Sequence, residues 1–320
     1  MRSLCVRISG TIDQSRRVQR VRLPIIETTR LTKRYGRRGG IEAVDLSVSE
    51  GQICGFLGPN GSGKTTAIRV LVGLLRPGSG VARVFGLDCW RQSPQVKRHV
   101  GYLPGDLRLY SWMTGRDAVA IFGRIRGRDL ALPAAALAER FALPMQQRVR
   151  TMSRGTRQKL GLVLALAHEP RLMILDEPTT GLDPPMRSAL AAYLRERSAV
   201  GDTVFFSSHT LGEVEQLCDR VSILRSGRVV ADESLETLRN RAKRTVTIEF
   251  RSAAAAQEVA APPFLAVVQR NGANWQCQLV GAAPPLIQWA GQQPLADLSL
   301  GKPDLETLFH AFYETPETER

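Results

Sequence analysis

The spacing of apolar residues along the chain predicts short buried strands that alternate with helices. The runs 53–57 and 172–175 are wholly apolar, which is typical of strands buried on both faces of a parallel sheet. Further strands are expected at 25–31, 43–48 and 203–208, with a hairpin joining 221–224 to 227–230. Helical spacing is found at 65–75, 116–125, 134–141, 157–167, 186–199 and 211–218. Together these elements predict an α/β fold with a mostly parallel sheet.

The pattern changes near residues 239–244, which predicts a second and smaller α+β domain. Strands are expected at 245–250 and 275–280, a helix at 286–292, and loops at 253–256 and 260–263. Asp304 is expected to cap a last helix. That helix carries an apolar stripe of Leu305, Leu308, Phe309 and Phe312, which forms either a small core of its own or part of an interface. We therefore divide the chain into a basic extension (1–24), an α/β domain (25–240, with a helical part at about 106–167) and an accessory domain (241–320).

Composition fits this two-domain division and excludes several classes of protein. Hydrophobic residues make up 43% of the 320 positions, which excludes a mostly disordered chain or a disulfide scaffold. No apolar run approaches the roughly 20 residues that a membrane-spanning helix needs. The five cysteines are scattered without a C-x-x-C pair, which favours a reducing cytoplasm and no zinc site.

The net charge of +14 raises the question of a nucleic-acid or anionic membrane partner. Most of the excess lies in residues 1–38, which hold 11 Lys and Arg against 2 Asp and Glu. Residues 241–320 hold 7 against 8. We interpret 1–24 as a flexible arm or as the result of a mis-chosen start codon, with a phosphate- or lipid-binding role as the alternative. The uneven distribution of the charge argues against a nucleic-acid partner.

A glycine-rich loop between the strand 53–57 and the helix that follows it carries the clearest chemistry. Its residues are Gly58, Pro59, Asn60, Gly61, Ser62, Gly63, Lys64 and Thr65, followed by Thr66. They match G-x-x-x-x-G-K-[ST] in the strand–loop–helix context that this motif requires. Backbone N–H groups in such a loop surround phosphate oxygens, while Lys64 is expected to neutralise the β- and γ-phosphates and Thr65 to hold Mg²⁺.

Two adjacent carboxylates end the strand 172–175. Asp176 is expected at the carboxyl edge of the sheet, beside the glycine-rich loop, where it holds Mg²⁺ through water. Glu177 follows, in a place where a carboxylate can orient or deprotonate an attacking water. The sequence thus predicts a site for hydrolysing a nucleoside triphosphate.

Several further segments, in a fixed order, resemble the ATP-binding subunits of ABC transporters over residues 25–238. The segment 152–159 resembles the family's LSGGQ signature and retains Ser153 and Gly155, although Met152, Arg154 and Thr156 depart from it. Residues 178–183 resemble the D-loop, with Asp183 facing a dimer partner. His209 matches the switch histidine that touches the γ-phosphate, and Tyr35 matches the aromatic residue that stacks on adenine.

The resemblance implies a P-loop NTPase fold of the ABC type, with a mostly parallel sheet, an antiparallel β part and a helical subdomain. It also implies ATP and Mg²⁺ as ligands and a homodimer, or a pair of ATPase subunits, that encloses two ATP molecules. The partner is then a polytopic membrane permease, and the chain is cytoplasmic and peripheral on the inner face of the cell membrane. Within the family, the resemblance is to exporters of the drug- and antibiotic-resistance type.

The main departure from the family lies after the segment 100–104, which resembles one of the family's strands. Gly105 stands where the family usually has a Gln that senses Mg²⁺ and water, and Asp106 is the candidate replacement as a metal ligand. The segment 107–113, rich in apolar and aromatic residues, either docks the permease or is buried against the helical subdomain.

Two alternative functions remain open from the sequence. One is a soluble ABC ATPase acting on ribosomes or DNA, supported only by the basic extension. The other is a weakly hydrolysing regulatory nucleotide binder, suggested by Gly105, Arg154 and Thr156. The presence of Lys64 and Glu177 in their motifs argues against that second alternative.

Overall fold

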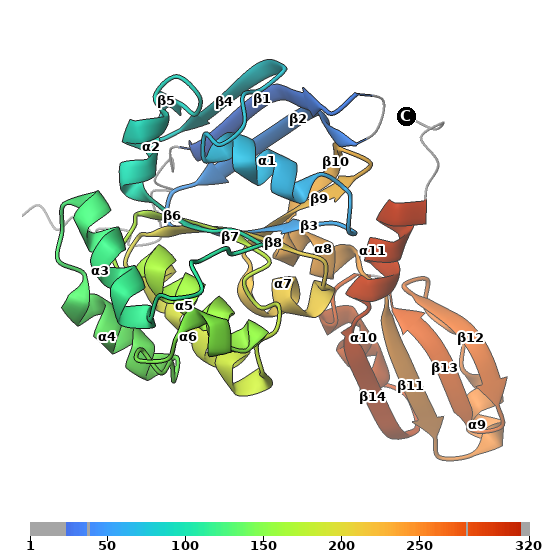
Figure 1. The fold of residues 1–320 in the computed structure, drawn as a ribbon. Coiled ribbons are helices and arrows are strands. Elements are labelled where there is room, and N and C mark those ends of the chain that lie inside the picture. The colour runs from blue at the N-terminus through green and yellow to red at the C-terminus, as the bar shows by residue number, and fades with distance from the viewer. Residues whose placement is uncertain (1–23, 37–38, 280, 315–320) are drawn as a thin grey trace, which may run out of the picture.

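The computed structural model describes residues 24–36, 39–279 and 281–314 (Figure 1). The predicted extension 1–24 lies outside the described residues, apart from Pro24. Two parts are evident in Figure 1, an α/β part that contains most of the chain and a smaller part built on β11–β14. Among the residues described, no helix is both long enough and apolar enough to cross a bilayer.

A six-stranded sheet forms the centre of the α/β part. Its strands are β3 (Ile53–Leu57), β6 (Val100–Leu103), β7 (Leu172–Asp176), β8 (Thr203–Ser208), β9 (Arg220–Arg225) and β10 (Arg228–Ser234). They lie in the order β10-β9-β3-β8-β7-β6, and all are parallel except β10. Every residue of β3, β7 and β8 is buried, which confirms the strands predicted from apolar runs. Because these three strands are parallel neighbours, their carboxyl ends meet at one edge.

A second, antiparallel sheet covers one face of the first. Its strands are β1 (Pro24–Arg34), β2 (Gly40–Ser49), β4 (Ser79–Val84) and β5 (Leu87–Asp88), in the order β2-β1-β4-β5. The helix α1 (Lys64–Leu71) lies between the two sheets, with Ile68 and Leu71 fully buried there (Figure 1). A short helix, α2 (Ser93–His99), follows β5. We did not predict β4, because its residues 79–83 are mostly exposed and show no clear apolar alternation.

Helices cover the other face of the central sheet. They are α3 (Gly115–Arg126), α4 (Ala131–Arg140), α5 (Arg154–Leu166), α6 (Pro184–Ala199) and α7 (Leu211–Leu217), with a short turn of 3-10 helix at Val149–Thr151. Four of these five helices, α3 to α6, begin one to three residues earlier than expected. The reason is that apolar spacing marks the first buried residue, whereas polar caps set the true start. Thr114, Ser153 and Asp183 cap α3, α5 and α6 in this way.

The accessory part is a four-stranded antiparallel sheet with two short helices. Its elements are β11 (Arg244–Phe250), α9 (Ala253–Glu258), β12 (Leu265–Asn271), β13 (Asn274–Leu279), α10 (Pro284–Ala290) and β14 (Leu295–Pro303), with strand order β12-β13-β11-β14. A separate core surrounds Trp275 and Phe250, whose ring centroids lie 4.8 Å apart. The prediction of a loop at 253–256 was wrong, because Ser252 caps a helix there and Ala256 is buried.

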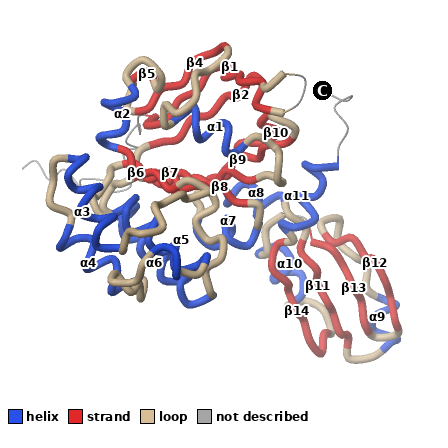
Figure 2. Tube along the Cα trace, viewed as in Figure 1, coloured by secondary structure: helices blue, strands red, loops and turns tan. Residues whose placement is uncertain are grey.

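The last helix, α11 (Leu305–Glu314), returns from the accessory sheet to the α/β part. Leu305 and Phe309 are buried in the same cluster as Leu235 and Leu238 of α8 (Leu235–Arg241), and Figure 2 shows the two helices side by side. Arg225 donates a hydrogen bond of 2.9 Å to the Phe312 carbonyl. The apolar stripe on this helix is therefore not a small core of the accessory domain, because it completes the core of the α/β part. The predicted cap is confirmed, since Asp304 accepts the Thr307 N–H.

We expect Phe309→Ala to destabilise the α/β part, although residue 309 follows the accessory sheet in the sequence. Loss of a buried aromatic side chain typically costs about 3–5 kcal/mol of unfolding free energy. Urea unfolding followed by intrinsic fluorescence measures the change. Ile287→Ala, at an exposed position of α10, is the matched control. An equal and small loss in both variants would contradict the packing described above.

Candidate functional site

Three loops converge at the carboxyl edge of the central sheet. The glycine-rich loop follows β3, Asp176 and Glu177 end β7, and His209 follows β8. The register of the parallel strands sets Leu57 beside Ser208 and Asp176 beside Ser207. The residues that the sequence assigned to one site therefore do lie together, and they lie where ligands bind in open α/β sheets.

The glycine-rich loop adopts a backbone that only glycine fits at several positions. Gly61 and Gly63 have φ angles of 81° and 108°, in the left-handed region. A Cβ atom at Gly63 would lie 2.5 Å from the Gly40 carbonyl oxygen, and one at Gly58 would lie 2.4 Å from the Leu224 carbonyl oxygen. Such loops turn successive N–H groups inward and bind anions, especially where a helix begins, as α1 does here.

Lys64 lies inside this loop, and its side chain is buried. The ammonium donates to the carbonyl oxygens of Gly58, at 2.6 Å, and Pro59, at 3.1 Å, and lies 3.8 Å from Glu177 Oε1. Burial lowers the pKa of Lys64, while the carboxylates of Glu177 and Asp176 act in the opposite direction. The loop thus concentrates a cation and N–H donors at one point, which suits the terminal phosphates of a nucleotide.

Asp176 offers a buried oxygen that has no hydrogen-bond partner among the residues that the structure describes. Its side chain is 1% exposed, and Oδ1 accepts a 2.5 Å hydrogen bond from the Ser207 hydroxyl. Oδ2 is buried without a hydrogen-bond donor. An unpaired carboxylate oxygen is costly to bury, and a hard divalent cation is the partner that would satisfy it.

These residues therefore fit a Mg²⁺ ion, which Asp176 and the Thr65 hydroxyl would hold, and which would neutralise phosphate charge during hydrolysis. The described part of the chain contains no group of three His, Cys, Asp or Glu side chains able to hold a metal ion. Phosphate and water oxygens would accordingly supply the other ligands, as is usual for Mg²⁺. Thr66, the next residue along, is half-buried in the same first turn of α1.

Glu177 has an unusual backbone and lies against the histidine of the site. Its φ angle is 49°, in the left-handed region that residues other than glycine rarely adopt. Oε1 lies 3.4 Å from His209 Nδ1, and Oε2 accepts a 3.3 Å hydrogen bond from Thr180. Its carboxylate is partly exposed and the His209 side chain is about half exposed. This pair therefore remains accessible to a substrate.

Tyr35 directly follows β1, in the segment that connects β1 to β2. The residue is 46% exposed. A hollow of about 540 Å³ opens next to the loop and is lined by Arg34, Gly36, Gly39, Gly40, Ile41, Glu42, Gly61, Ser226 and Gly227. Glu42 fixes one side of the hollow through ion pairs to Arg34 (2.6 Å) and Arg228 (3.1 Å), and the hydrogen bond from Arg34 lowers its pKa. The stacking of Tyr35 on a base stays a prediction.

Ser153, Gly155 and Asp183 belong to two segments that touch each other. Ser153 accepts the Thr156 N–H at 3.1 Å, and Asp183 accepts the Met186 N–H at 3.0 Å, so each caps a helix. A Cβ atom at Gly155 would lie 2.6 Å from the Gly181 carbonyl oxygen. The signature-like segment therefore packs directly on the loop that carries Asp183.

Position 105 abuts Asp176, but Asp106 has another partner. A Cβ atom at Gly105 would lie 3.2 Å from Asp176 Oδ2. Asp106 is exposed and forms an ion pair of 2.9 Å with Arg108. The backbone at 105 therefore lies close to Asp176, whereas the Asp106 carboxylate is paired with Arg108, and its role as a metal ligand stays a prediction.

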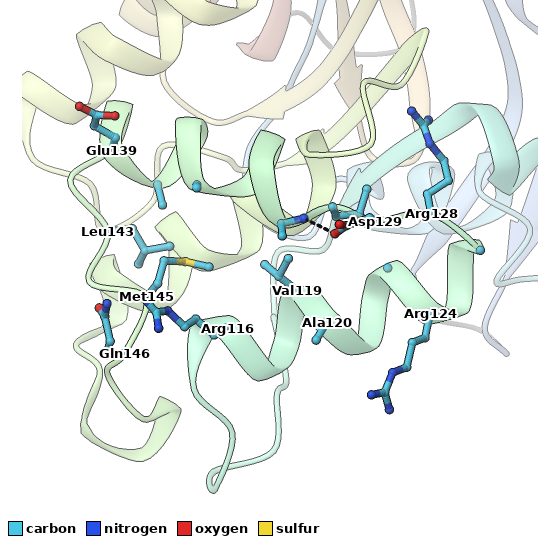
Figure 3. A pocket seen from close by; sticks show the side chains of 16 residues that line it. Arg116, Val119, Ala120, Arg124, Arg128, Asp129, Glu139, Leu143, Met145 and Gln146 are labelled. Atoms are coloured by element: carbon cyan, nitrogen blue, oxygen red, sulfur yellow. Dashed lines mark hydrogen bonds between the residues drawn. The ribbon is translucent and has the colours of Figure 1, made fainter.

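The hollow drawn in Figure 3 lies elsewhere, within the helical subdomain. It has a volume of about 830 Å³ and opens between α3 and α4, with Val119, Leu143 and Met145 on its walls. None of the residues assigned to the site lines it. The nucleotide site must therefore be sought at the carboxyl edge of the sheet.

Two residues of the site escaped sequence reasoning. Ser207 binds both Asp176 and the backbone N–H of Glu177, and Gln158 of α5 donates to the carbonyl oxygens of Glu177 and Pro178. Ser207 follows apolar residues of its predicted strand, which is a sign of a buried polar group, whereas Gln158 lies among polar residues and gives no such sign. The sequence pattern cannot identify the partner of either side chain.

The sequence profile described as "ABC transporter" matches residues 41–180. The chain is 37% identical over 232 residues to the bacitracin transport ATP-binding protein BcrA of Bacillus licheniformis, covering 71% of this chain and 75% of that protein. It is 36% identical over 220 residues to the daunorubicin/doxorubicin resistance ATP-binding protein DrrA of Streptomyces peucetius, covering 67% of each chain.

The fold is similar to that of solved ATP-binding cassettes. An ATP-binding subunit of an ABC transporter superposes with a TM-score of 0.63 at 30% identity, covering 67% of this chain and 92% of that one. A bacterial ABC transporter cassette solved as a dimer gives a TM-score of 0.57 at 22% identity and covers 66% of this chain and 98% of its own. This second likeness concerns the fold alone. The predicted α/β fold of the ABC type is confirmed.

We expect Asp176→Asn to raise the Mg²⁺ concentration needed for half-maximal ATP hydrolysis by about ten-fold or more, because the substitution removes the charge beside the unpaired oxygen. Nucleotide binding without Mg²⁺ should change little. Titration of activity with Mg²⁺, together with fluorescence binding of an ATP analogue, measures both. Asp106→Asn should leave the Mg²⁺ dependence unchanged, and a shift there would instead support Asp106 as a ligand.

Proposed function

Because this chain belongs to the family of ABC transporter ATP-binding subunits, which are ATPases, we propose that it uses ATP and Mg²⁺ to drive export of a small molecule through a separate membrane permease. The observation that carries this proposal is the meeting of Lys64, Asp176, Glu177 and His209 at one edge of the sheet. The relatives named for bacitracin transport and for daunorubicin/doxorubicin resistance favour a drug-like or antibiotic cargo.

The site residues divide the chemistry of hydrolysis among them. The loop N–H groups and Lys64 hold the β- and γ-phosphates, since they supply fixed positive charge where negative charge gathers. Glu177 orients the attacking water and accepts its proton. His209, whose Nδ1 lies 3.4 Å from Glu177 Oε1, contacts the γ-phosphate. Tyr35 stacks on the adenine.

The chain acts as a head-to-tail dimer that encloses two ATP molecules. In this arrangement Ser153 and Gly155 of one subunit close over the ATP held by the other subunit, and Asp183 faces the partner. The N-terminus of α5 supports this role, because Ser153 and the first N–H groups of a helix attract phosphate. A bacterial ABC transporter cassette of the same fold was solved as a dimer.

The permease is proposed to dock in a groove between α2, α3 and β6. The groove has a volume of about 900 Å³ and an apolar floor, and the side chains of Leu74 and Ile125 are exposed along it. Its charged lining residues are all cationic: Lys97, Arg98, Arg124, Arg126 and Arg128. An amphipathic segment with acidic residues would complement this surface.

One buried side chain of the groove, His168, does not contribute to its positive charge. His168 lines it, is 3% exposed, and has a ring nitrogen, Nδ1, without a hydrogen-bond partner. Burial, together with the charges of Arg126 and Arg128, lowers the pKa of His168 to about 4. The imidazole is therefore neutral at pH 7, and the arginines retain the positive charge that an acidic segment would meet.

The residues of the segment 107–113 divide between the two roles predicted for it, burial against the helical subdomain and docking of the permease. Met113 is buried and Leu109 packs against the core, whereas Tyr110 and Trp112 are exposed and stack with ring centroids 6.2 Å apart. The exposed aromatic pair extends the proposed docking surface, since aromatic residues are enriched at interface cores. This docking places the chain in the cytoplasm, peripheral on the inner face of the cell membrane.

We expect Glu177→Gln to trap an ATP-bound dimer, because the chemistry of hydrolysis is lost while the phosphate contacts remain. Size-exclusion chromatography with light scattering, in ATP and Mg²⁺, measures the dimer fraction. Glu196→Gln, which alters an exposed carboxylate paired with Arg140, should behave like the unmodified chain. Only monomer in the Glu177→Gln sample would count against the proposal.

We expect the double substitution Arg98→Glu and Arg124→Glu to abolish permease binding by reversing two exposed charges of the groove. A tagged pull-down from gently solubilised membranes, washed in high salt, should recover a polytopic membrane protein with the unmodified chain but not with this variant. Arg116→Glu, in the hollow of Figure 3, is the matched control. Recovery of ribosomes or DNA in place of a membrane protein would overturn the transport role.

A further inference from the structure

The main chain of Glu177 is held in a conformation that its own residue type disfavours. A φ angle of 49° is rare for a residue with a β-carbon, so neighbouring groups must hold it there. Changing this angle would move the carboxylate away from His209 and Lys64, which lie 3.4 Å and 3.8 Å from Oε1. The groups that fix the backbone therefore also fix the carboxylate.

Ser207 holds the amino side of this residue. It is fully buried on β8, and its hydroxyl accepts the Glu177 N–H at 2.9 Å. The same hydroxyl donates to Asp176 Oδ1 at 2.5 Å. One hydroxyl can make both bonds because it has one hydrogen and two lone pairs. Ser207 therefore links the metal-binding carboxylate to the backbone of the next residue.

Gln158 holds the carboxyl side. It projects from α5, is 8% exposed, and its Nε2 donates to the carbonyl oxygens of Glu177, at 3.2 Å, and Pro178, at 3.0 Å. An apolar side chain of the same size would fill this space but would leave two carbonyl groups without these donors. Gln158 lies five residues after Ser153, on the helix that Ser153 caps.

We propose that Ser207 and Gln158 are positioning residues that clamp the two peptide groups of Glu177 and thereby aim its carboxylate at the attacking water. This inference rests on the role proposed above for Glu177. Gln158 belongs to α5, the helix that begins in the signature-like segment. When that segment contacts ATP held by the other subunit, a displacement of α5 is transmitted to the Glu177 peptide through the Gln158 hydrogen bonds. The clamp thus links the position of the Glu177 carboxylate in one site to the binding of ATP at the other site.

The clamp is tested on the full chain with Ser207→Ala, Ser207→Thr and Gln158→Glu. Ser207→Ala should lower kcat about ten-fold or more, since small misplacements of a catalytic group have effects of this size or larger. The Kd for an ATP analogue without Mg²⁺ should change less than about two-fold, because the phosphate loop is untouched. Threonine should restore most of kcat because it keeps the hydroxyl.

Gln158→Glu separates hydrogen bonding from space filling. Glutamate is nearly the same size but, when ionised, has no donor for the two carbonyl groups, so kcat should fall here too. Ser222→Ala is the matched control, because Ser222 is also a buried serine bonded to a carboxylate, Asp232 Oδ1 at 2.8 Å. Ser222 lies on β9, which β3 separates from β8. Its kcat should stay within about two-fold of the unmodified chain, as two separate sites are usually independent.

A double-mutant cycle decides whether Ser207 acts through Glu177. In a Glu177→Gln background, adding Ser207→Ala should cause no further loss of hydrolysis, because the two residues act as one unit. A further loss there, or a folded Ser207→Ala protein with full kcat, would overturn the clamp, and Gln158→Glu provides the same test if Ser207→Ala does not fold. Full hydrolysis by Glu177→Gln alone would instead show that the role proposed for Glu177 is wrong.

Discussion

The parallel pairing of β3, β8 and β7 is the constraint on which the rest of the site depends. It brings the ends of three strands that are far apart in the sequence to one edge, with Leu57 beside Ser208 and Ser207 beside Asp176. Strands buried on both faces cannot shift register without exposing apolar side chains or burying polar ones. The positions of the phosphate loop, the carboxylates and the histidine therefore follow from how the core packs.

At this edge of the sheet, the charged side chains of the site are incompletely paired with one another. Lys64 is buried and bonded mainly to carbonyl oxygens, and Asp176 keeps one buried oxygen without a donor. The Lys64 ammonium has no carboxylate at hydrogen-bonding distance among the described residues, since Lys64 Nζ and Glu177 Oε1 stay 3.8 Å apart. A polyanion accompanied by a divalent cation would complete both sets of interactions at once.

The sequence was sufficient to predict the elements that are specified by the pattern of residues within one short segment. The buried strands, the capped helices and the glycine-rich loop are of this kind, because apolar runs and glycine spacing report directly on burial and backbone shape. It was not sufficient for β4, β12 and β14, because these partly exposed strands lack a regular alternation of buried and exposed residues. Nor did it indicate the partners of Ser207 and Gln158, because those contacts join residues 19 to 31 positions apart.

The return of α11 to the α/β part means that this part is completed last during synthesis. Leu305 and Phe309 complete a core whose other buried members lie before residue 243. The whole sheet of β11–β14, which has its own core around Trp275, leaves the ribosome before these two side chains do. The larger part of the chain is made first, but its core is complete only after the accessory sheet has been synthesised.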